Sequence, residues 1–299
     1  MQPLEPAAPG ADLTIVMPAY NEGQALARNL PELLEFCRSY GFRLSVTDDG
    51  SRDDTGAVLA THASHPNLTI VKHKLNRGYG SAIKSGVLSS TSRYVVTIDA
   101  DGQHRLEDVL SLYQTIKARD ADMIIGKRTV HGKENLYRKT GKSLIRTVAR
   151  LLMPLHVHDL NSGMKIYDTA LGKKYLKLCP DSMAYSDVIA LVFISQRHLV
   201  LEEPITVDPR TTGTSTISTR TAFETVMEIL NVVILFNPMR IFLPSALLLF
   251  LSGVGWGTPI ILRGHGVSVA AMLLIVTGVI FFFLGLIAEQ LSLIRKNSL

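Results

Sequence analysis

One stretch of sequence decides how this chain folds: YVVTIDADGQH, from Tyr94 to His104. Its apolar and β-branched first half predicts a buried strand, which ends at Asp99 and Asp101. Carboxylates at i and i+2 project toward one side of a strand end. Such a pair suits a hard divalent cation, Mg²⁺ or Mn²⁺, which prefers oxygen ligands and keeps positions open for phosphate oxygens. A solvated loop that merely contains two acids is the alternative.

Short apolar runs alternate with helical stretches on both sides of this strand, from Leu13 to about Gly126. We predict strands, each buried on both faces, at Leu13–Met17, Leu44–Thr47, Leu68–Val71, Tyr94–Ile98 and Met123–Ile125. We predict helices at Ala25–Tyr40, Thr55–His62, Ser81–Ser89 and Leu106–Ala118. Strands and helices that alternate at such short intervals predict an α/β fold, with a mostly parallel sheet between helices. In such sheets, ligands bind beyond the carboxyl ends of the strands.

Polar loops follow the first four predicted strands. They are PAYNE at 18–22, DDGSRDDT at 48–55, NRGYG at 76–80 and DAD at 99–101. Each loop alone is explained as a turn or a helix cap, because Asp, Asn, Ser and Gly are the usual residues there. Four such loops in succession on one edge of a sheet favour a ligand site.

The hydrophobic content of the chain is concentrated near its C-terminus. The 299 residues are 46% hydrophobic with a mean hydropathy of +0.21, which is high for a purely soluble protein. Ile241–Leu262 and Gly266–Ala288 carry no charge, and each is just over the roughly 20 residues that cross a bilayer as a helix. We predict two membrane helices rather than a buried core hairpin. Because the loop between them is very short, they must be antiparallel neighbours.

Basic residues orient the predicted hairpin. Arg240 precedes it, and Arg295 and Lys296 follow it. The loop offers only Arg263, so the positive-inside rule places the large N-terminal part in the cytoplasm. The net charge of +5 suits anionic lipid headgroups or a phosphorylated ligand. Nucleic acid is not a predicted partner, because the basic residues are dispersed and no zinc-finger spacing is present.

Neither the N-terminus nor the cysteines indicate secretion. Residues 1–12 are predicted to be a disordered tail, rich in Pro and Ala, without the basic and apolar regions of a signal peptide. Cys37 and Cys179 are too few for a disulfide framework and are not spaced for zinc. Both are predicted to be ordinary packing residues in a reducing compartment.

Three of the motifs together carry a family resemblance. PAYNE at 18–22, DDGS at 48–51 and DADGQH at 99–104 resemble family 2 glycosyltransferases of the GT-A fold, in order and in spacing. The similarity is closest to the branch of dolichol-phosphate mannose synthase and other polyprenyl-phosphate glycosyltransferases, and it extends from Leu13 to Thr216. It implies a UDP- or GDP-linked sugar as donor, a polyprenyl phosphate as acceptor and Mg²⁺ or Mn²⁺ as cofactor.

The resemblance and the hydropathy pattern divide the chain into segments. We predict a GT-A catalytic domain at 13–218, an interfacial amphipathic helix at 219–238 and the membrane hairpin at 239–299, which ends in a short cytoplasmic segment. The amphipathic helix rests on apolar residues at helical spacing with Glu224 and Glu228 opposite. An integral membrane protein of this kind would receive a phosphate head group while the isoprenoid tail stays in lipid.

The resemblance assigns roles on the donor side. In this family the acid of the second loop contacts the nucleotide base, which carries over to Asp49 with help from Asp48. A carboxylate accepts from an N–H of either uracil or guanine. The other residues expected at the nucleotide are Pro18, Tyr20, Glu22, Asp99 and Ala100. The cation that bridges the diphosphate would be held by Asp99, Asp101 and Gln103, and His104 would either support these ligands or lie exposed.

On the acceptor side, the resemblance places arginines on phosphate groups. Arg128 and Arg138 would contact the lipid phosphate, and Arg210 would help to clamp the diphosphate. Asp101, Asp159 and Asp187 form the predicted catalytic set. Asp159 is either a base or an orienting residue, and a polyprenyl phosphate, already ionised near neutral pH, requires no strong base. Asp187 is either a shorter substitute for a family glutamate or a helix N-terminal residue.

Two positions depart from the family pattern. Lys165 replaces an arginine at the end of the element DLNSGMK, and Thr216 replaces a lysine of the diphosphate clamp. Arg210, alone or together with Arg220, would then have to compensate for the charge that is missing at Thr216. His156 and His158 have strand-like spacing, but no third ligand is near in sequence, so a packing or surface role is favoured over a metal site.

These features predict an inverting, metal-dependent enzyme that transfers a single sugar from a nucleoside-diphosphate sugar to a polyprenyl phosphate at the cytoplasmic membrane face. One alternative is a catalytically idle, membrane-tethered nucleotide-sugar binding partner. Another is a processive polysaccharide synthase, but such relatives carry Gln-x-x-Arg-Trp, and the only tryptophan, Trp256, lies in the first membrane run. The sugar, the base, the lipid and the oligomeric state, a homo-oligomer included, stay open.

Overall fold

The computed structural model describes residues 12–128, 157–207, 227, 230, 233–234 and 236–297. They form two compact units, one made of the described residues up to 207 and the other of those from 227 onward. The predicted tail, apart from Asp12, and most of the predicted amphipathic helix at 219–238 lie outside the described residues.

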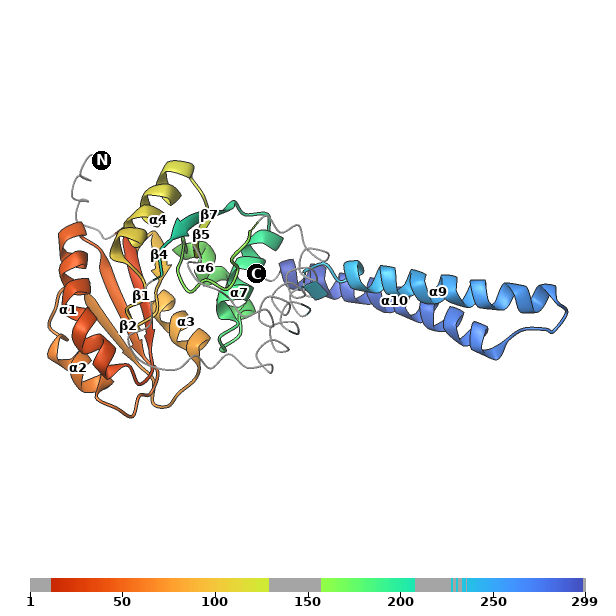
Figure 1. Cartoon of the computed structure of the whole chain (residues 1–299), viewed down its shortest axis with the longest axis horizontal. Helices are drawn as coiled ribbons and strands as arrows, with labels where there is room; N and C mark the ends of the chain where they lie inside the picture. Colours follow the sequence, from red (N-terminus) through yellow and green to blue (C-terminus); the bar gives the residue numbers. More distant parts are fainter. Residues whose placement is uncertain are drawn as a thin grey trace. The chain divides into compact units, whose positions relative to one another are not determined.

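The first unit is built on a seven-stranded mixed sheet with the strand order β3-β2-β1-β4-β6-β5-β7 (Figure 1). The strands are β1 (Leu13–Ala19), β2 (Arg43–Asp48), β3 (Leu68–Lys72), β4 (Tyr94–Thr97), β5 (Met123–Arg128), β6 (Lys165–Asp168) and β7 (Val200–Ile205). All neighbours pair in parallel except β6, which runs antiparallel to both β4 and β5. The predicted α/β class with a mostly parallel sheet is confirmed.

β3 differs from the other predicted strands because it forms an edge of the sheet. β1 and β4 are buried along their whole length, as expected for central strands covered on both faces. β3 is partly or fully exposed at each residue, because among the described strands it pairs with β2 alone. The prediction that Leu68–Val71 is buried on both faces was therefore wrong. An apolar run shows that a strand is covered, but it does not show the order of strands in the sheet.

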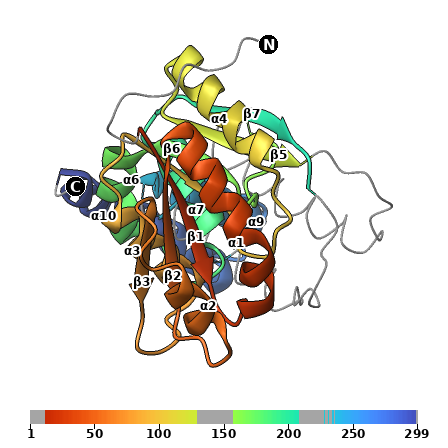
Figure 2. The same cartoon turned by 90° about the vertical axis from the view of Figure 1, so that its left-hand side faces the viewer.

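Helices cover both faces of this sheet. They are α1 (Gly23–Tyr40), α2 (Thr55–Thr61), α3 (Tyr79–Ser89), α4 (Leu106–Arg119), α6 (Thr169–Tyr175) and α7 (Tyr185–Ser195). Figure 1 shows α1 and α3 on opposite sides of β1 and β2, and α1 lies in front of the sheet in Figure 2. Apolar side chains of α1 and α4, such as Leu30 and Leu112, are fully buried in one core with β1 and β4. This core holds the polar ends of the strands in place.

A glycine brings α3 unusually close to the sheet. A Cβ atom on Gly86 would lie 2.5 Å from Cγ1 of Val16 in β1, so no larger residue fits without a shift. Ser45 of β2 approaches the same point, at 3.5 Å from that Cβ position. The close contact positions the start of α3, with Tyr79, beside the end of β4.

The second unit is a helical hairpin. Its helices, α9 (Met239–Leu262) and α10 (Val269–Asn297), contact each other, and both are long and apolar enough to cross a membrane by length and composition. Gly253 and Gly257 of α9 face α10, where Ala271 is 2% exposed. Small residues let the two backbones approach closely, which is how helices associate in a bilayer.

We expect Gly253→Leu to force α9 and α10 apart. A Cβ atom on Gly253 would already lie 2.7 Å from Cγ1 of Ile275, and overpacking of this kind costs roughly 1–3 kcal/mol. Gly255→Leu is the matched control, because no described atom outside the adjacent backbone of α9 lies within 4 Å of its Cβ position. Thermal unfolding in detergent, followed by circular dichroism, should show a lower melting temperature for Gly253→Leu alone. Equal melting temperatures for the two variants would contradict this interface.

Candidate active site

The loops after β1 and β2 are joined to each other at the carboxyl edge of the sheet. Asn21, with a left-handed φ of 55°, donates its backbone N–H to Ser51 Oγ at 3.0 Å and accepts from the N–H of Arg52 at 2.8 Å. Glu22 donates its N–H to Thr55 Oγ1 at 2.9 Å. Short polar side chains of the second loop thus satisfy the backbone of the first. The two predicted nucleotide loops form one rigid edge.

The paired acids of the second loop are buried and bonded to backbone groups. Asp48 Oδ1 accepts from the N–H of Ser51 at 2.9 Å. Asp49 accepts from the N–H groups of Arg77 and Gly78, at 2.9 and 2.8 Å, which belong to the loop after β3. Asp49 therefore connects the loops after β2 and β3, in addition to its predicted contact with a base.

The remaining residues predicted at the nucleotide differ in exposure. Tyr20 is 41% exposed at the end of β1, so its ring is accessible to a ligand. Pro18 and Ala100 are buried, so their side chains are not accessible to a ligand, and they contribute to the site through the course of the backbone. Glu22 is partly buried immediately before α1. Among these side chains, Tyr20 is the most accessible one for packing against a base.

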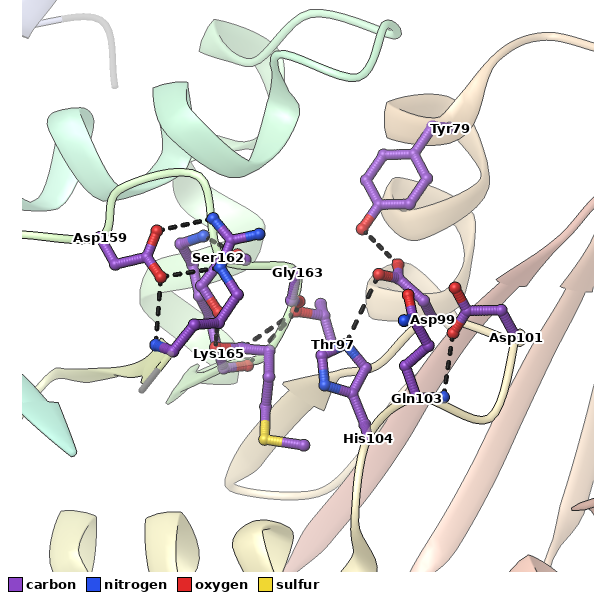
Figure 3. Close-up of polar contacts among 12 residues, drawn as sticks. Tyr79, Thr97, Asp99, Asp101, Gln103, His104, Asp159, Ser162, Gly163 and Lys165 are labelled. Atoms are coloured by element: carbon purple, nitrogen blue, oxygen red, sulfur yellow. Dashed lines mark hydrogen bonds and ion pairs between the residues drawn. The ribbon is translucent and has the colours of Figure 1, made fainter. Parts of the chain in front are cut away.

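Asp99 lies at the centre of the site, just beyond β4 (Figure 3). Its Oδ1 accepts from the Tyr79 hydroxyl at 2.9 Å, and its Oδ2 lies 3.5 Å from Nε2 of His104. Burial, followed by the charge of Asp99, raises the pKa of Tyr79 well above its ordinary value, so the phenol stays protonated and donates. Two side chains thus orient the Asp99 carboxylate.

Asp101 and His104 are nearly buried beside Asp99. Asp101 is 7% exposed, and its Oδ1 accepts from the N–H of Gln103 at 3.1 Å. The side chain of His104 is 6% exposed, and its Nδ1 has no partner among the described residues. The side chain of His104 is therefore next to Asp99 and not exposed to solvent, which agrees with the prediction that it supports the proposed cation ligands.

The loop after β4, which we call the acidic edge, carries oxygen donors of the kind that a divalent cation prefers. No group of three or more His, Cys, Asp or Glu side chains that could hold a metal occurs within the described parts of the chain. Asp99, Asp101 and Gln103 nevertheless offer oxygen atoms on one loop. Mg²⁺ is commonly held by one or two carboxylates together with substrate phosphates and water, so a complete protein cage is not required.

Across from Asp99, the loop before β6 carries Asp159. Its carboxylate accepts from the Arg128 backbone N–H at 3.1 Å and from Arg128 Nε and Nη2, both at 2.8 Å. Burial acts to raise the pKa of Asp159, but the hydrogen bonds and charge of Arg128 outweigh burial and lower it. A carboxylate with a lowered pKa is a poor base, so the geometry favours the orienting role of Asp159.

Glycine allows this loop to touch the acidic edge. A Cβ atom on Gly163 would lie 2.6 Å from Oδ2 of Asp99, and Thr97 of β4 donates its hydroxyl to the Gly163 carbonyl at 2.6 Å. A side chain at position 163 would therefore require the Asp99 carboxylate to shift. The donor-side acids and Asp159 are therefore held together by the segment between them (Figure 3).

Two buried ionisable groups of opposite charge, Lys165 and Asp187, are close enough to Asp159 to be influenced by its charge. Burial lowers the pKa of Lys165 to about 8, and its ammonium group donates to the Ser162 carbonyl. Burial likewise raises the pKa of Asp187, in the first turn of α7, to about 6, although the charge of Lys165 opposes this rise. Each group partly compensates the charge of the other.

Several predicted residues are not placed at this site by the structure. Arg138, Arg210 and Thr216 lie outside the described residues, and so does His156. Nδ1 of His158 lies 2.8 Å from a carboxylate oxygen of Glu202, and the His158 side chain is 54% exposed, which agrees with the surface alternative of its predicted packing or surface role.

Sequence reasoning missed the roles of Tyr79 and Gly163. Tyr79 belongs to the third polar loop, NRGYG, but only the fold shows that its hydroxyl reaches Asp99. Gly163 lies within the element DLNSGMK, which matches the family pattern Asp-x-x-Ser-Gly-x-Arg, but only the fold shows that this glycine lies against Asp99.

Two family matches agree with this architecture. Residues 14–176, more than half of the chain, match glycosyl transferase family 2, and residues 237–294 match the GtrB C-terminal hairpin. The chain belongs to glycosyl transferase family 2. The resemblance inferred from the three loop motifs is confirmed.

Curated relatives share this domain at modest identity. An undecaprenyl-phosphate 4-deoxy-4-formamido-L-arabinose transferase of Photorhabdus laumondii is 27% identical over 60% of this chain and 56% of its own length. A dolichyl-phosphate beta-glucosyltransferase of Dictyostelium discoideum is 28% identical over 54% of this chain and 53% of its own length. The chain therefore spans little more than half the length of these two relatives.

A solved structure confirms the GT-A-like fold of the first unit. Glucosyl-3-phosphoglycerate synthase from Mycobacterium tuberculosis, in complex with Mn²⁺, UDP-glucose and phosphoglyceric acid, matches with a TM-score of 0.59. The match covers 75% of this chain and 80% of that one at 16% identity, which shows the fold alone.

We expect Asp187→Asn to change how stability depends on pH. The pKa of Asp187 in the folded protein, about 6, lies above its unfolded value, so its proton stabilises the fold at low pH, and this contribution is lost as pH rises through 6. Between pH 5 and 7.5 the wild type should lose about 1 kcal/mol, or a few degrees of melting temperature, relative to the variant. Melting curves of both proteins across this range check it, and parallel pH profiles would contradict the assignment.

Proposed function

We propose that this protein transfers one sugar from a nucleoside-diphosphate sugar, UDP- or GDP-linked, to a polyprenyl phosphate, with inversion at the anomeric carbon and with Mg²⁺ or Mn²⁺ as cofactor. The observation that carries the proposal is that two groups of charged side chains, one acidic and one containing an arginine, occur in the same site. Asp99 and Asp101 form an oriented acidic edge, and Arg128, at the end of β5, pairs with Asp159 on the loop whose Gly163 lies against Asp99. One set suits a diphosphate with its cation, and the other suits a phosphate acceptor.

Asp99, Asp101 and Gln103 would hold the cation, which, when bound, stabilises the negative charge that grows on the departing diphosphate. The chain's own residues prepare this edge in advance. Tyr79 and His104 fix the orientation of the Asp99 carboxylate, so little reorganisation is needed on binding.

Arg128 is suited to the acceptor because its guanidinium group is only partly used. Nε and one N–H of Nη2 point to Asp159, and a guanidinium group carries five N–H donors. The other donors face no described partner, and a bidentate fork matches phosphate oxygens. Asp159 would then orient Arg128, while the ionised lipid phosphate attacks without losing a proton to the protein.

The hairpin and the relatives support a lipid acceptor. α9 and α10 are apolar enough to span a bilayer, and the two relatives described above are named for transfer involving undecaprenyl and dolichyl phosphates. The positive charge that flanks the hairpin supports a site on the cytoplasmic side.

We expect Asp101→Asn to abolish sugar transfer while the protein stays folded. The substitution preserves size but removes one of the two charges proposed to hold the cation. Membranes that contain the protein, a labelled nucleotide sugar and polyprenyl phosphate should yield an acid-labile lipid that extracts into organic solvent. Asp120→Asn is the control, because the Asp120 side chain is 96% exposed and its left-handed φ of 46° is tolerated by Asn. A wild-type yield of labelled lipid from Asp101→Asn would contradict the assignment of Asp101 to the cation. A wild type that binds nucleotide but transfers no sugar would instead favour the alternative of a catalytically idle binding partner.

We expect Arg128→Lys to impair use of the lipid more than use of the nucleotide sugar. A lysine can neither form the bidentate pair with Asp159 nor present a fork to a phosphate. The KM for polyprenyl phosphate should rise about tenfold, as for loss of one charge-assisted hydrogen bond, and the KM for nucleotide sugar should stay nearly constant. Initial rates with each substrate varied in turn measure both constants. An equal rise in both would place Arg128 outside the acceptor site.

A further inference from the structure

A chain of three buried or partly buried side chains ends at the base-reading acid. Nδ1 of His73 lies 2.6 Å from Oδ1 of Asp49, and Nε2 of the same ring lies 2.9 Å from the hydroxyl oxygen of Ser85 on α3. His73 is 7% exposed, and its backbone N–H donates to the Asp48 carbonyl at 2.9 Å. The sequence motifs gave no role to His73 or Ser85, and the transfer chemistry above uses neither.

The direction of these hydrogen bonds follows from the acid. An ionised carboxylate only accepts, so the proton lies on Nδ1 of His73, which donates to Asp49. Nε2 then accepts from the Ser85 hydroxyl when the ring is neutral, or donates to it when the ring is charged. In both cases Asp49 receives one hydrogen bond from His73, and Ser85 holds the ring in that orientation.

Counting lone pairs shows how little of Asp49 is left for a ligand. A carboxylate has about four acceptor positions, two on each oxygen. Oδ1 accepts from His73 and from the Arg77 N–H, which fills both of its positions. Oδ2 accepts from the Gly78 N–H, which leaves one position on this atom with respect to the described residues. The Asp49 side chain is only 3% exposed, so it cannot turn to present the other oxygen without breaking these bonds.

The two candidate bases make different demands on this acid. Uracil presents a single N–H donor on its pairing edge, between two carbonyl acceptors, so one lone pair of Oδ2 is sufficient. Guanine presents two adjacent donors, N1–H and the exocyclic amine, and both oxygens of a carboxylate are needed to accept from both. Because both acceptor positions of Oδ1 are already used, one of the two guanine donors would give up its hydrogen bond to water on binding and form no new hydrogen bond. An unpaired donor of this kind is costly in a buried site.

We propose that the Ser85–His73–Asp49 chain is a specificity device that restricts the site to uridine diphosphate sugars, with His73 as the residue that positions the base-reading acid. This inference rests on the proposed function, because it takes Asp49 to be the residue that contacts the base. It goes further by selecting between the two nucleotides that the motifs leave open.

Direct binding of UDP and GDP to the full-length protein in detergent, with Mg²⁺ present, tests the proposal by calorimetry without any need to know the sugar. The wild type should bind UDP at least about tenfold more tightly than GDP, the ratio expected when one buried donor is left unpaired. His73→Ala removes a donor from Oδ1 and frees the acid to turn. Its UDP affinity should fall about tenfold while its GDP affinity changes little, so that the selectivity is lost.

Three further variants separate positioning from general damage. His73→Asn keeps an N–H donor near the place of Nδ1, so it should retain most of the selectivity. Ser85→Ala releases the far end of the chain and should lower the UDP:GDP ratio in the same direction, but by less than His73→Ala. Ser89→Ala is the matched control one turn further along α3, where the hydroxyl contacts Ser45 instead, and it should bind both nucleotides as the wild type does.

The outcomes distinguish this inference from the proposed function. A wild type that binds GDP as tightly as UDP overturns the inference and leaves the transfer proposal standing. A His73→Ala variant with the wild-type ratio overturns it as well. Where His73→Ala does not fold, Ser85→Ala takes its place, and an unchanged ratio in Ser85→Ala overturns the inference. A wild type that binds neither nucleotide overturns the proposed function itself.

Discussion

The position of β4 between a parallel and an antiparallel neighbour is the constraint on which the site depends. β1 runs parallel to β4, so the loops that follow β1 and β4 emerge at the same edge of the sheet. β6 runs antiparallel to β4, so the segment that enters β6 arrives at that edge as well. The start of α3, through Tyr79, and the Asp159 loop, through Gly163, both lie against Asp99 although more than sixty residues separate Tyr79 from Gly163 along the chain. The hydrogen bond from the Thr97 hydroxyl to the Gly163 carbonyl connects the Asp159 loop to the end of β4.

Placing so many charges at one edge is tolerated because each has a partner. Arg128 forms an ion pair with Asp159, and the charge of Asp187 acts on Lys165. Asp99 accepts a hydrogen bond from the Tyr79 hydroxyl. The family arginine at the position of Lys165 would stay charged in any environment, whereas a buried lysine changes its protonation more readily. The replacement thus keeps the compensation of Asp187 but makes it depend on a group whose pKa is about 8. Removing either partner of such a pair leaves an uncompensated buried charge, which costs more than the pair itself contributes.

The sequence predicted much of this arrangement, and its failures have physical causes. The strand at Tyr94–Thr97, the four polar loops and the acidic pair follow from periodicity and from the chemistry of strand ends, which are local properties. The reversed strand β6 was not predicted, because four residues, KIYD, carry too little periodicity to be recognised. The edge position of β3 and the contact of Tyr79 with Asp99 were missed because both depend on the order of strands, which is set by tertiary packing. The interpretation of Asp159 also depends on the fold, because the hydrogen bonds and charge of Arg128 lower the pKa of its carboxyl group although burial acts to raise it, and a lowered pKa favours an orienting role over a base.

What a polar residue can do for a ligand depends on how many of its hydrogen-bonding positions the protein has already used. Arg128 and Asp49 show the two sides of this count. Arg128 uses two of its side-chain donors on Asp159, and its other donors have no partner among the described residues, which suits the proposed contact with a phosphate. Within the described part of the chain, Asp49 accepts three hydrogen bonds and connects two loops, which leaves a single acceptor position for the proposed contact with one N–H of a base. A motif identifies both residues equally well, but only the fold shows that one is nearly open and the other is nearly filled.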